Sequence, residues 1–524
     1  MNGQYASLLI ALPLISAFFV PLIKGLGRKV VMAYLVLITA LQTAIAGWVA
    51  NEVYSTGKPI IVMAGGWKPP VGINLYIGHF AALFVLIIAV ISFFMAFFSF
   101  KAVTVEPVDK YAMLFLLLML GATGMIVTGG DIFNLFVFME ITSITAYALT
   151  AYNKTGEAAE ASMKYIVLGG IGSSFFLIGV ALIYGATGTL NMAHLAQLAG
   201  AIDPTVAQVG LALIIFGLAV EAELFPLNAW APDAYQAAPH PITVMFSALV
   251  VKAGLYAIAR LLYILQNANG WSGVLKLVII MATLTVVVAE FSALRQKDVK
   301  RMIAYSSISQ VGMIAFALAL GTQAGVDAGV FHMVNHAIVK ALLFLTVGYV
   351  GVALGGTAIE NFRGLGKRMP LTALTLTIGS LAAVGIPLFN IFWSKVRILL
   401  AGVEAGYSWS VALILGASVV EAVYYLRLIH TMWFVEGGER VRENFVIGGV
   451  IALFLAALII AIGVYPNDIW TIVQKAGQDV FNVANYIKNV PLMGGWEHER
   501  DTDYPLYSSP CWSTCLADKR EGSP

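Results

Sequence analysis

Ionisable side chains stand inside apolar stretches of this sequence. Glu140 and Lys252 each lie near the middle of an apolar run, and Lys395 follows a proline-containing break in another. A charged side chain at membrane depth is costly, so such residues face the interior of a helix bundle and usually take part in function. These three residues are therefore the first candidates for a chemical role.

A second set of candidates lies on one stripe of the apolar run 329–354. His332, His336 and Lys340 are spaced at i, i+4 and i+8, which places them on one face of a helix. Two histidines four residues apart can share a zinc ion. No carboxylate follows on that stripe, and Lys340 would repel a cation. We therefore predict proton transfer rather than metal binding here.

The chemistry that fits these residue types is proton exchange. Burial away from water disfavours the charged form of a lysine or a carboxylate, so both can exchange protons near neutral pH. Histidine titrates in that range already. The sequence predicts a proton relay, with two carboxylates just ahead of a helix break as candidate gating residues. The relay set is Glu140, Lys252, His332, His336, Lys340 and Lys395, and the gating candidates are Glu221 and Glu223.

Membrane-spanning helices must position these residues. The chain has 524 residues, of which 60% are hydrophobic and only 11% charged, against about 25% charged in an ordinary soluble domain. This composition excludes a soluble enzyme and a disordered chain. The net charge of +2, without a long basic stripe, argues against nucleic acid as a partner. We predict an all-α polytopic protein in a lipid bilayer.

About fourteen apolar runs have the roughly 20 residues that a transmembrane helix needs. They lie near 5–23, 29–50, 76–100, 111–129, 131–152, 163–185, 206–230, 240–265, 272–294, 302–321, 329–354, 371–401, 407–433 and 445–465. Lysine and arginine gather in the odd-numbered loops, most densely between Arg295 and Arg301. The positive-inside rule makes those loops cytoplasmic. Both termini are then expected on the outer side of the cell (plasma) membrane.

Two of these runs are interrupted by proline. Pro226 breaks the seventh run and Pro387 the twelfth, because proline removes a helix hydrogen-bond donor. Two broken spans that lie five helices apart predict two five-helix repeats of inverted topology, with discontinuous helices 7 and 12. The expected parts are residues 1–110 with helices 1–3, repeats at 111–265 and 272–433, helix 14 at 445–465, and an amphipathic to polar tail at 466–524.

The sequence predicts no cofactor in this chain. Its two cysteines, Cys511 and Cys515, both lie in the polar tail. Their spacing is not a standard zinc or redox motif, and two thiols alone cannot hold a haem, an iron–sulfur cluster or a zinc ion. Any electron chemistry linked to the chain must therefore belong to other subunits.

Several motifs together carry a family resemblance over about residues 75–465. They occur in the order Asn134–Glu140, Pro226–Ala234, Lys252–Arg260, Gln296–Ile308, Asn335 and His336 with Lys340, Met369–Ala373, Gly385–Pro387, and Ser394 with Lys395. In these motifs the chain resembles the antiporter-like subunits of complex I (the N, M and L type), the D-type subunit of Mrp sodium/proton antiporters, and the corresponding subunit of membrane-bound hydrogenases and sulfur reductases.

The resemblance implies a fourteen-helix fold with inverted repeats and ion translocation along a central polar axis. Its functional residues carry over to Glu140, Lys252, His336, Lys340 and Lys395. The chain departs from the family at Glu221, where a lysine is usual, and at Asn228, where a histidine is usual.

Because of these departures, the sequence allows more than one arrangement of charges in the first part of the expected proton path. If Glu140 and Glu221 are close, they cannot both ionise in a dry site, so they would share a proton or bind a sodium ion. Lys164 or Lys252 could instead supply the missing positive charge. Asp233, within the Pro226–Ala234 motif, is a further candidate gating residue.

The leading hypothesis is a proton-translocating, antiporter-like subunit of a multisubunit redox complex. Its partners would be other membrane subunits and a redox arm that carries iron–sulfur or metal centres. An alternative is a Mrp-type monovalent cation/proton antiporter subunit without a redox partner. A third is a structural membrane anchor with an inactive half-channel. The sequence motifs do not separate the first two, because both kinds of complex share the module.

Overall fold

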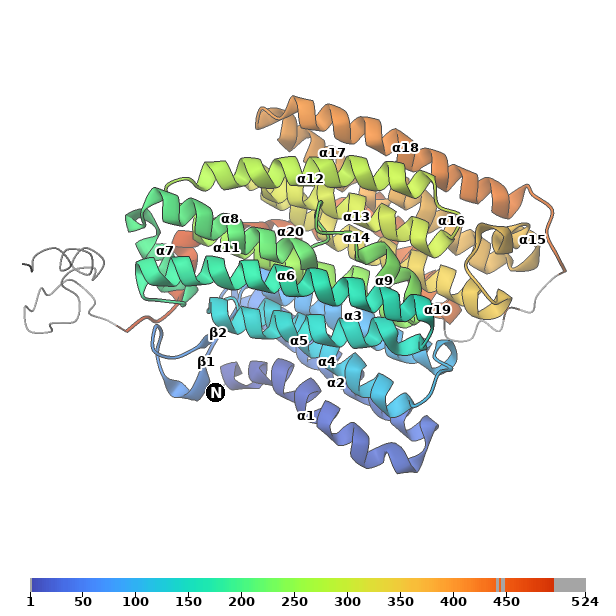
Figure 1. The fold of residues 1–524 in the computed structure, drawn as a ribbon, viewed down its shortest axis with the longest axis horizontal. Coiled ribbons are helices and arrows are strands. Elements are labelled where there is room, and N and C mark those ends of the chain that lie inside the picture. The colour runs from blue at the N-terminus through green and yellow to red at the C-terminus, as the bar shows by residue number, and fades with distance from the viewer. Residues whose placement is uncertain (1, 440–442, 444–447, 494–524) are drawn as a thin grey trace, which may run out of the picture.

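The structure, a computed structural model, describes residues 2–439, 443 and 448–493. In this part of the chain, eleven helices are long and apolar enough to cross a membrane, and the bent pair α19–α20 makes a twelfth if it is counted as one span. The long helices run alongside one another in one bundle (Figure 1). The predicted helical, multi-pass membrane architecture is confirmed at this level.

Helices make up nearly all of the described bundle. The first three long helices are α1 (Leu8–Ile23), α2 (Arg28–Thr56) and α3 (His79–Ala102). Between α2 and α3, strands β1 (Ile60–Met63) and β2 (Asn74–Ile77) pair as an antiparallel hairpin. The other long helices are α4 (Val108–Val127), α5 (Ile132–Thr150), α6 (Gly156–Thr187), α8 (Pro204–Glu221), α11 (Val251–Ile264), α12 (Trp271–Leu294), α13 (Val299–Leu318), α14 (Gln323–Leu354) and α18 (Ser408–Trp433).

Shorter helices connect or interrupt these spans. They are α7 (Met192–Leu198), α9 (Ala231–Ala237), α10 (His240–Met245), α15 (Leu365–Arg368), α16 (Pro370–Val384), α17 (Asn390–Glu404), α19 (Gly448–Val464), α20 (Pro466–Phe481) and α21 (Val483–Asn489). The count of fourteen expected from the sequence exceeds twelve by two segments. One is α13, which is long enough to span a membrane but is less apolar than the other long helices. The other is the interrupted pair α16–α17, in which each helix is too short to span a membrane by itself.

Both proline-containing segments are interrupted where the sequence places the breaks. In the first, α8 ends at Glu221 and helix resumes only in α9. In the second, α16 ends at Val384, and Gly385 follows with a φ of 86°, a left-handed conformation that glycine adopts without strain. These breaks expose backbone carbonyls inside the bundle, which buried donors can then use.

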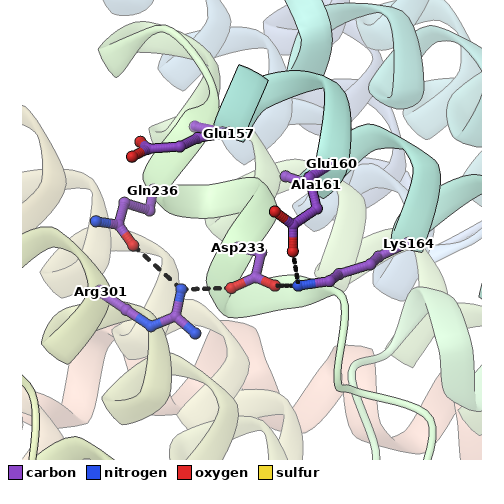
Figure 2. Close-up of a pocket in the computed structure, with 8 residues that line it drawn as sticks. Glu157, Glu160, Ala161, Lys164, Asp233, Gln236 and Arg301 are labelled. Atoms are coloured by element: carbon purple, nitrogen blue, oxygen red, sulfur yellow. Dashed lines mark hydrogen bonds and ion pairs between the residues drawn. The ribbon is translucent and has the colours of Figure 1, made fainter. Parts of the chain in front are cut away.

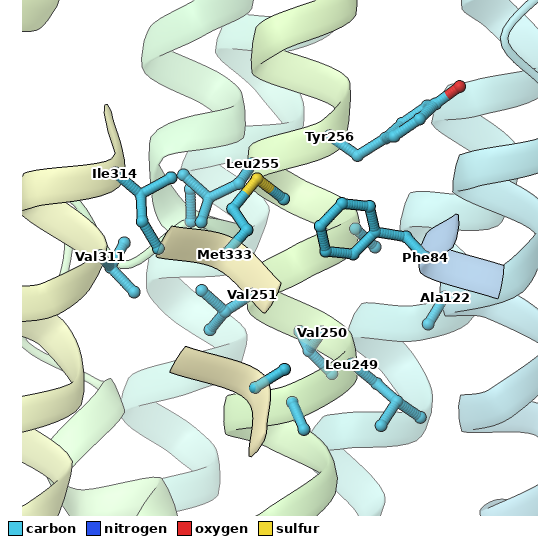
Figure 3. Close-up of a cluster of buried hydrophobic side chains, with 14 of the residues drawn as sticks. Phe84, Ala122, Leu249, Val250, Val251, Leu255, Tyr256, Val311, Ile314 and Met333 are labelled. Carbon is cyan, nitrogen blue, oxygen red and sulfur yellow. The ribbon is translucent and has the colours of Figure 1, made fainter. Parts of the chain in front are cut away.

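Helix α11 lies at the centre of the bundle. All of its residues are buried, and it continues from α10 through a π-helical turn at Phe246–Val250. Figure 3 shows its apolar side chains, among them Val251 and Leu255, packed against Phe84 of α3 and Met333 of α14. Apolar side chains therefore surround α11, except where polar side chains of neighbouring helices contact the helix.

The C-terminal helices fold back onto the same core. Arg260 of α11 is only 1% exposed, and its guanidinium lies 3.3 Å from a carboxylate oxygen of Asp479 on α20. Tyr76 also donates a 3.0 Å hydrogen bond to that carboxylate. Arg260 lies near the end of its apolar run, a position that predicts access to water, but the structure contradicts this prediction, because a partner 219 residues away compensates the burial of the guanidinium. The tail beyond residue 493, with Cys511 and Cys515, lies outside the described residues.

Candidate functional site

The first part of the site joins α5, α6 and α8. The Ser143 hydroxyl donates a 2.7 Å hydrogen bond to Glu221 Oε1, and the Ser173 hydroxyl donates to Glu140. The carboxylates of Glu140 and Glu221 are close enough to interact electrostatically. The end of α8 at the helix break thus places Glu221 next to the α5 glutamate.

Glu140 is less buried than the rest of the site. It belongs to one stripe of α5 at the spacing i, i+4, i+7 and i+11, together with the apolar residues Phe133, Val137 and Ile144. These three are 47%, 39% and 61% exposed in the isolated chain, and Glu140 is half-buried among them. A carboxylate in such a stripe at membrane depth is poorly suited to contact with lipid tails.

Glu223 and Lys252 form the next step toward the bundle centre. Both side chains are 0% exposed, and they attract each other electrostatically. Neither carboxylate oxygen of Glu223 has a hydrogen-bond partner among the described residues. Since a buried carboxylate that accepts no well-formed hydrogen bond is costly, Glu223, which faces Lys252 and the Tyr235 hydroxyl, is suited to hold a proton or to draw one from its surroundings.

Lys252 is joined to the central helix α14. Its Nζ donates a 2.8 Å hydrogen bond to the carbonyl oxygen of Ser247, in the π-helical turn, and contacts Nδ1 of His336. His336 Nε2 lies 3.2 Å from the hydroxyl of Ser307, which in turn lies 2.9 Å from the hydroxyl of Ser247. A lysine, a histidine and two serines therefore form one connected group.

His332 continues the line one helical turn away. Its Nδ1 lies 2.8 Å from the hydroxyl of Ser394, and its Nε2 lies 2.7 Å from Oε1 of Gln310. Both ring nitrogens of His332 and both of His336 therefore already have partners within the protein. This geometry disfavours a zinc ion shared by the two histidines, and no group of three metal-ligating side chains occurs among the described residues.

The last part of the site is a cluster of two lysines around a glutamate. Lys395 forms a 2.5 Å ion pair with Glu421 of α18 and donates hydrogen bonds to the carbonyl oxygens of Ala383 and Val384, at the end of α16. Lys340 donates a 2.7 Å hydrogen bond to Ser306. The break after α16 therefore supplies the carbonyl oxygens that orient Lys395.

Polar residues of α13 and α18 complete this cluster, and the sequence analysis did not place them in the site. Gln310 donates a 2.7 Å hydrogen bond to Glu421, and Tyr425 donates a 3.0 Å hydrogen bond to Ser306. The available signal was the polar string Ser306–Gln310 inside the apolar run 302–321. Glu290 of α12 is a further buried carboxylate near this cluster that the sequence analysis missed.

Two of the candidate gating residues lie apart from this line, in a surface hollow. Lys164 forms a 2.7 Å ion pair with Asp233 and a 2.8 Å pair with Glu160, and Arg301 also pairs with Asp233 (Figure 2). Burial would raise the pKa of Asp233, but hydrogen bonds from Lys164 and Arg301 outweigh this effect and lower it. Lys164 is thus engaged at the surface and does not neutralise Glu221.

Asn228 is also not part of the line. It lies half-buried in the first helix break, and its side chain makes no hydrogen bond with another described residue. Its backbone carbonyl accepts from the amide of Ala231, which helps to start α9. The residue therefore contributes to the shape of the break.

Together, the buried groups form a row of carboxylates, lysines and histidines that crosses the bundle from α5 to α18. Hydrogen bonds or electrostatic contacts join successive members, and serines, a glutamine and a tyrosine lie between them. A change of charge at one member alters the protonation of its neighbour. The arrangement can therefore pass protons or couple their movement.

Comparison with known proteins agrees with this geometry. Residues 129–421 match the family model described as NADH:quinone oxidoreductase/Mrp antiporter, TM. The chain is 34% identical over 446 residues to NADH-quinone oxidoreductase subunit N of Desulforudis audaxviator, covering 83% of this chain and 87% of that protein. It is 31% identical over 501 residues to the D-type Na(+)/H(+) antiporter subunit of Bacillus subtilis, covering 93% and 99%.

Solved structures contain the same fold. A chain of the membrane-bound sulfane sulfur reductase, an archaeal respiratory membrane complex, superposes with a TM-score of 0.91 at 74% identity, covering 93% of this chain and 100% of that chain. A chain of the Mrp complex from a Dietzia species gives a TM-score of 0.84 at 27% identity, covering 94% and 99%.

Proposed function

Because this chain belongs to the NADH:quinone oxidoreductase/Mrp antiporter family of membrane subunits, we propose that it is the proton-translocating, antiporter-like subunit of a multisubunit membrane redox complex. The observation that carries the proposal is the buried row from Glu221 through Lys252 and His336 to Lys395. Keeping these charges buried is costly, which argues against a structural anchor with an inactive half-channel.

Protons, in this proposal, move along the row by a change of charge at successive members. Glu140, Glu221 and Glu223 act at one end, Lys252 with His336 and His332 in the middle, and Lys340 with Lys395 at the other end. The break after α16 supplies the free carbonyl oxygens that hold Lys395 in place, and the carbonyl oxygen of Ser247 in the π-helical turn holds Lys252. The serine hydroxyls between them provide hydrogen-bonding steps over which a proton can pass.

The proposal also includes partner subunits. The exposed stripe of Phe133, Val137 and Ile144 around Glu140 suits contact with another membrane subunit, because a neighbour can supply polar or cationic groups to the carboxylate. The 74% identity to a subunit of a sulfane sulfur reductase complex supports a redox arm with iron–sulfur or metal centres. This chain itself would then hold no cofactor.

A Mrp-type cation/proton antiporter subunit is the second candidate. Its support is the similarity to the D-type antiporter subunits and to a Mrp complex, and the paired carboxylates of Glu140 and Glu221, which suit a sodium ion. The much higher identity to the sulfur reductase subunit favours the redox complex.

Purification of the native complex tests this function. We expect the chain to copurify with other membrane subunits and with proteins that carry iron–sulfur or metal centres, while the isolated chain holds none. Electron transfer in reconstituted vesicles is expected to acidify or alkalinise the lumen. Copurification with small cation-antiporter subunits alone, and sodium-dependent proton exchange without a reductant, would favour the Mrp-type candidate instead.

Finer features of the fold belong to the same proposal. Counting α13 and the pair α16–α17 as spans gives fourteen, with two inverted five-helix repeats at 111–265 and 272–433. Residues 1–110 then precede the repeats, 445–465 form the last span, and 466–524 form the tail. The matching breaks after α8 and α16 support this division.

The proposal places the chain in the plasma membrane with both termini outside, as the basic odd-numbered loops indicate. We expect Cys511 and Cys515 to react with a membrane-impermeant maleimide in intact cells. A chain in which both cysteines are replaced by serine provides the background control. Labelling that occurs only after permeabilisation would show that the C-terminal tail lies on the inner side of the membrane and would contradict the proposed orientation.

A further inference from the structure

Glu290 is a buried carboxylate that the proposed relay does not yet use. It lies on α12 with 0% exposure, while Leu284, Val288 and Phe291 of the same helix are 42%, 39% and 54% exposed on the outward side. The carboxylate therefore points into the bundle. A carboxylate buried in this way requires compensation by its neighbours.

The neighbours of Glu290 are the lysine and glutamate cluster at the end of the relay. Tyr424 donates a 2.9 Å hydrogen bond to Glu290 Oε2, whereas Oε1 lacks a hydrogen bond of normal geometry to any described residue, although the Ser309 hydroxyl faces the carboxylate. The titratable groups that face Glu290 are Glu421, Tyr424 and Tyr425 of α18, Lys395 of α17 and Lys340 of α14. Glu290 is thus within electrostatic reach of both lysines.

The charges of this cluster balance only when Glu290 is included. With all groups ionised, Lys340 and Lys395 carry two positive charges and Glu421 one negative charge, so Glu290 brings the total to zero. A Glu290 carboxylate that stays ionised and exchanges no proton would already satisfy this balance. The oxygen without a normal hydrogen bond and the position of Glu290 in the membrane argue for more than that.

Glu290 is the member of the cluster nearest to a helix end. It precedes Leu294, the last residue of α12, by four residues, which is about 6 Å along a helix axis. The loop that follows is the most basic loop of the chain. Beside it, the exposed Arg427 donates hydrogen bonds to the carbonyl oxygens of Leu294 and Gln296, at 3.2 and 3.1 Å. Glu290 therefore stands between the cluster and the aqueous phase on the basic-loop face.

We propose that Glu290 is a pathway residue that exchanges protons between the basic-loop face and the Lys340–Lys395 cluster. The proposal rests on the proposed proton translocation. The Glu290 carboxylate takes a proton from the aqueous side and becomes a neutral carboxylic acid. It then gives that proton to the neutral amine of Lys395 or Lys340, which becomes an ammonium group as Glu290 returns to the carboxylate.

The test compares proton pumping by the whole complex in vesicles for wild type, Glu290→Gln, Glu290→Asp and Glu436→Gln over a range of pH. Glu436 is an exposed glutamate just beyond α18 and is the matched control. We expect Glu290→Gln to assemble and to pump about 100-fold more slowly, the lower end of what a positioned proton-transfer group contributes. Glu436→Gln should pump like wild type.

Glu290→Asp keeps the charge but shortens the side chain. We expect this variant to retain part of the pumping and to reach its maximal rate at a different pH, which a mere counter-charge would not require. The inference is overturned if both Glu290 variants show wild-type rates and pH profiles. If Glu290→Gln does not assemble, a wild-type pH profile in Glu290→Asp overturns it by itself. Absence of pumping in wild type would contradict the proposed function itself, so the two failures are distinguishable.

Discussion

Replacement of Lys395 with alanine is expected to abolish proton translocation while the complex still assembles. Lys395 is held by Glu421 at 2.5 Å and by two carbonyl oxygens at the end of α16. Its amino group forms the ion pair with Glu421 as the ammonium ion and can accept a proton once it is a neutral amine, so its loss removes the proton-exchanging group of that part of the relay. We expect the pumping rate to fall by at least about 100-fold. Lys252→Ala should have the same effect in the first half.

The Lys395→Ala variant leaves the buried Glu421 without its ion-pair partner, which destabilises the structure. A second variant separates this destabilisation from the loss of pumping. Without Lys395, the buried Glu421 loses its ion-pair partner and retains the hydrogen bond from Gln310, a 3.4 Å contact with Ser306 and the more distant charge of Lys340. Removing one partner of a buried ion pair costs about 3–5 kcal/mol. The double variant Lys395→Ala/Glu421→Gln removes that uncompensated charge. We expect it to assemble better than the single variant and still not to pump.

The measurement is vesicle acidification at matched electron-transfer rates, with subunit composition checked on the same preparation. Lys367→Ala, at an exposed lysine of the same chain, is the control and should pump normally. Full pumping by Lys395→Ala, or its recovery in the double variant, would show that Lys395 only stabilises the structure.

Much of the framework could be predicted from the sequence because lipid imposes simple rules. Long apolar runs predict spans, and prolines predict the breaks after α8 and α16. The stripe of His332, His336 and Lys340 was also readable, since helical spacing alone fixes which residues share a face. All three are 0% exposed in the structure.

The pairing between distant helices could not be read in the same way. Arg260 lies near the end of an apolar run, so access to water was the simpler interpretation until the fold brought Asp479 to it. Glu290 lies one turn from a basic loop and resembles a residue at the membrane surface for the same reason. Lys164 was considered as a partner for Glu221, but Asp233 and Glu160 engage it instead. In each case the decisive contact is long-range or depends on side-chain direction.

Glu221 is the residue at which this chain departs most clearly from its family, and its replacement is expected to change the ion dependence of transport. It is only 3% exposed, accepts a hydrogen bond from Ser143, and faces Glu140. Glu221 Oε2 has no partner among the described residues. Two carboxylates so placed repel each other when both are ionised, so we expect them to hold one proton or one sodium ion between them.

Glu221→Lys should convert this pair into an ion pair with Glu140. Gly254 packs directly against the backbone of residue 221, so the helix position is fixed and only the side chain changes. We expect assembly to be retained, because the first half of the site then carries one buried carboxylate fewer. The pH or sodium dependence of transport should shift. Glu221→Gln mimics the protonated carboxyl, so it should remove the dependence on that proton without restoring an ion pair.

The test is the transport rate against pH, and separately against sodium, for wild type, Glu221→Lys and Glu221→Gln, with the exposed Glu157→Gln on α6 as control. A sodium-binding pair predicts that wild type alone responds to sodium. A proton-sharing pair predicts that the curves differ in pH only. If all three curves superimpose on that of the control, Glu221 lies outside the path, and the acidic pair is a structural feature that the surrounding serines stabilise.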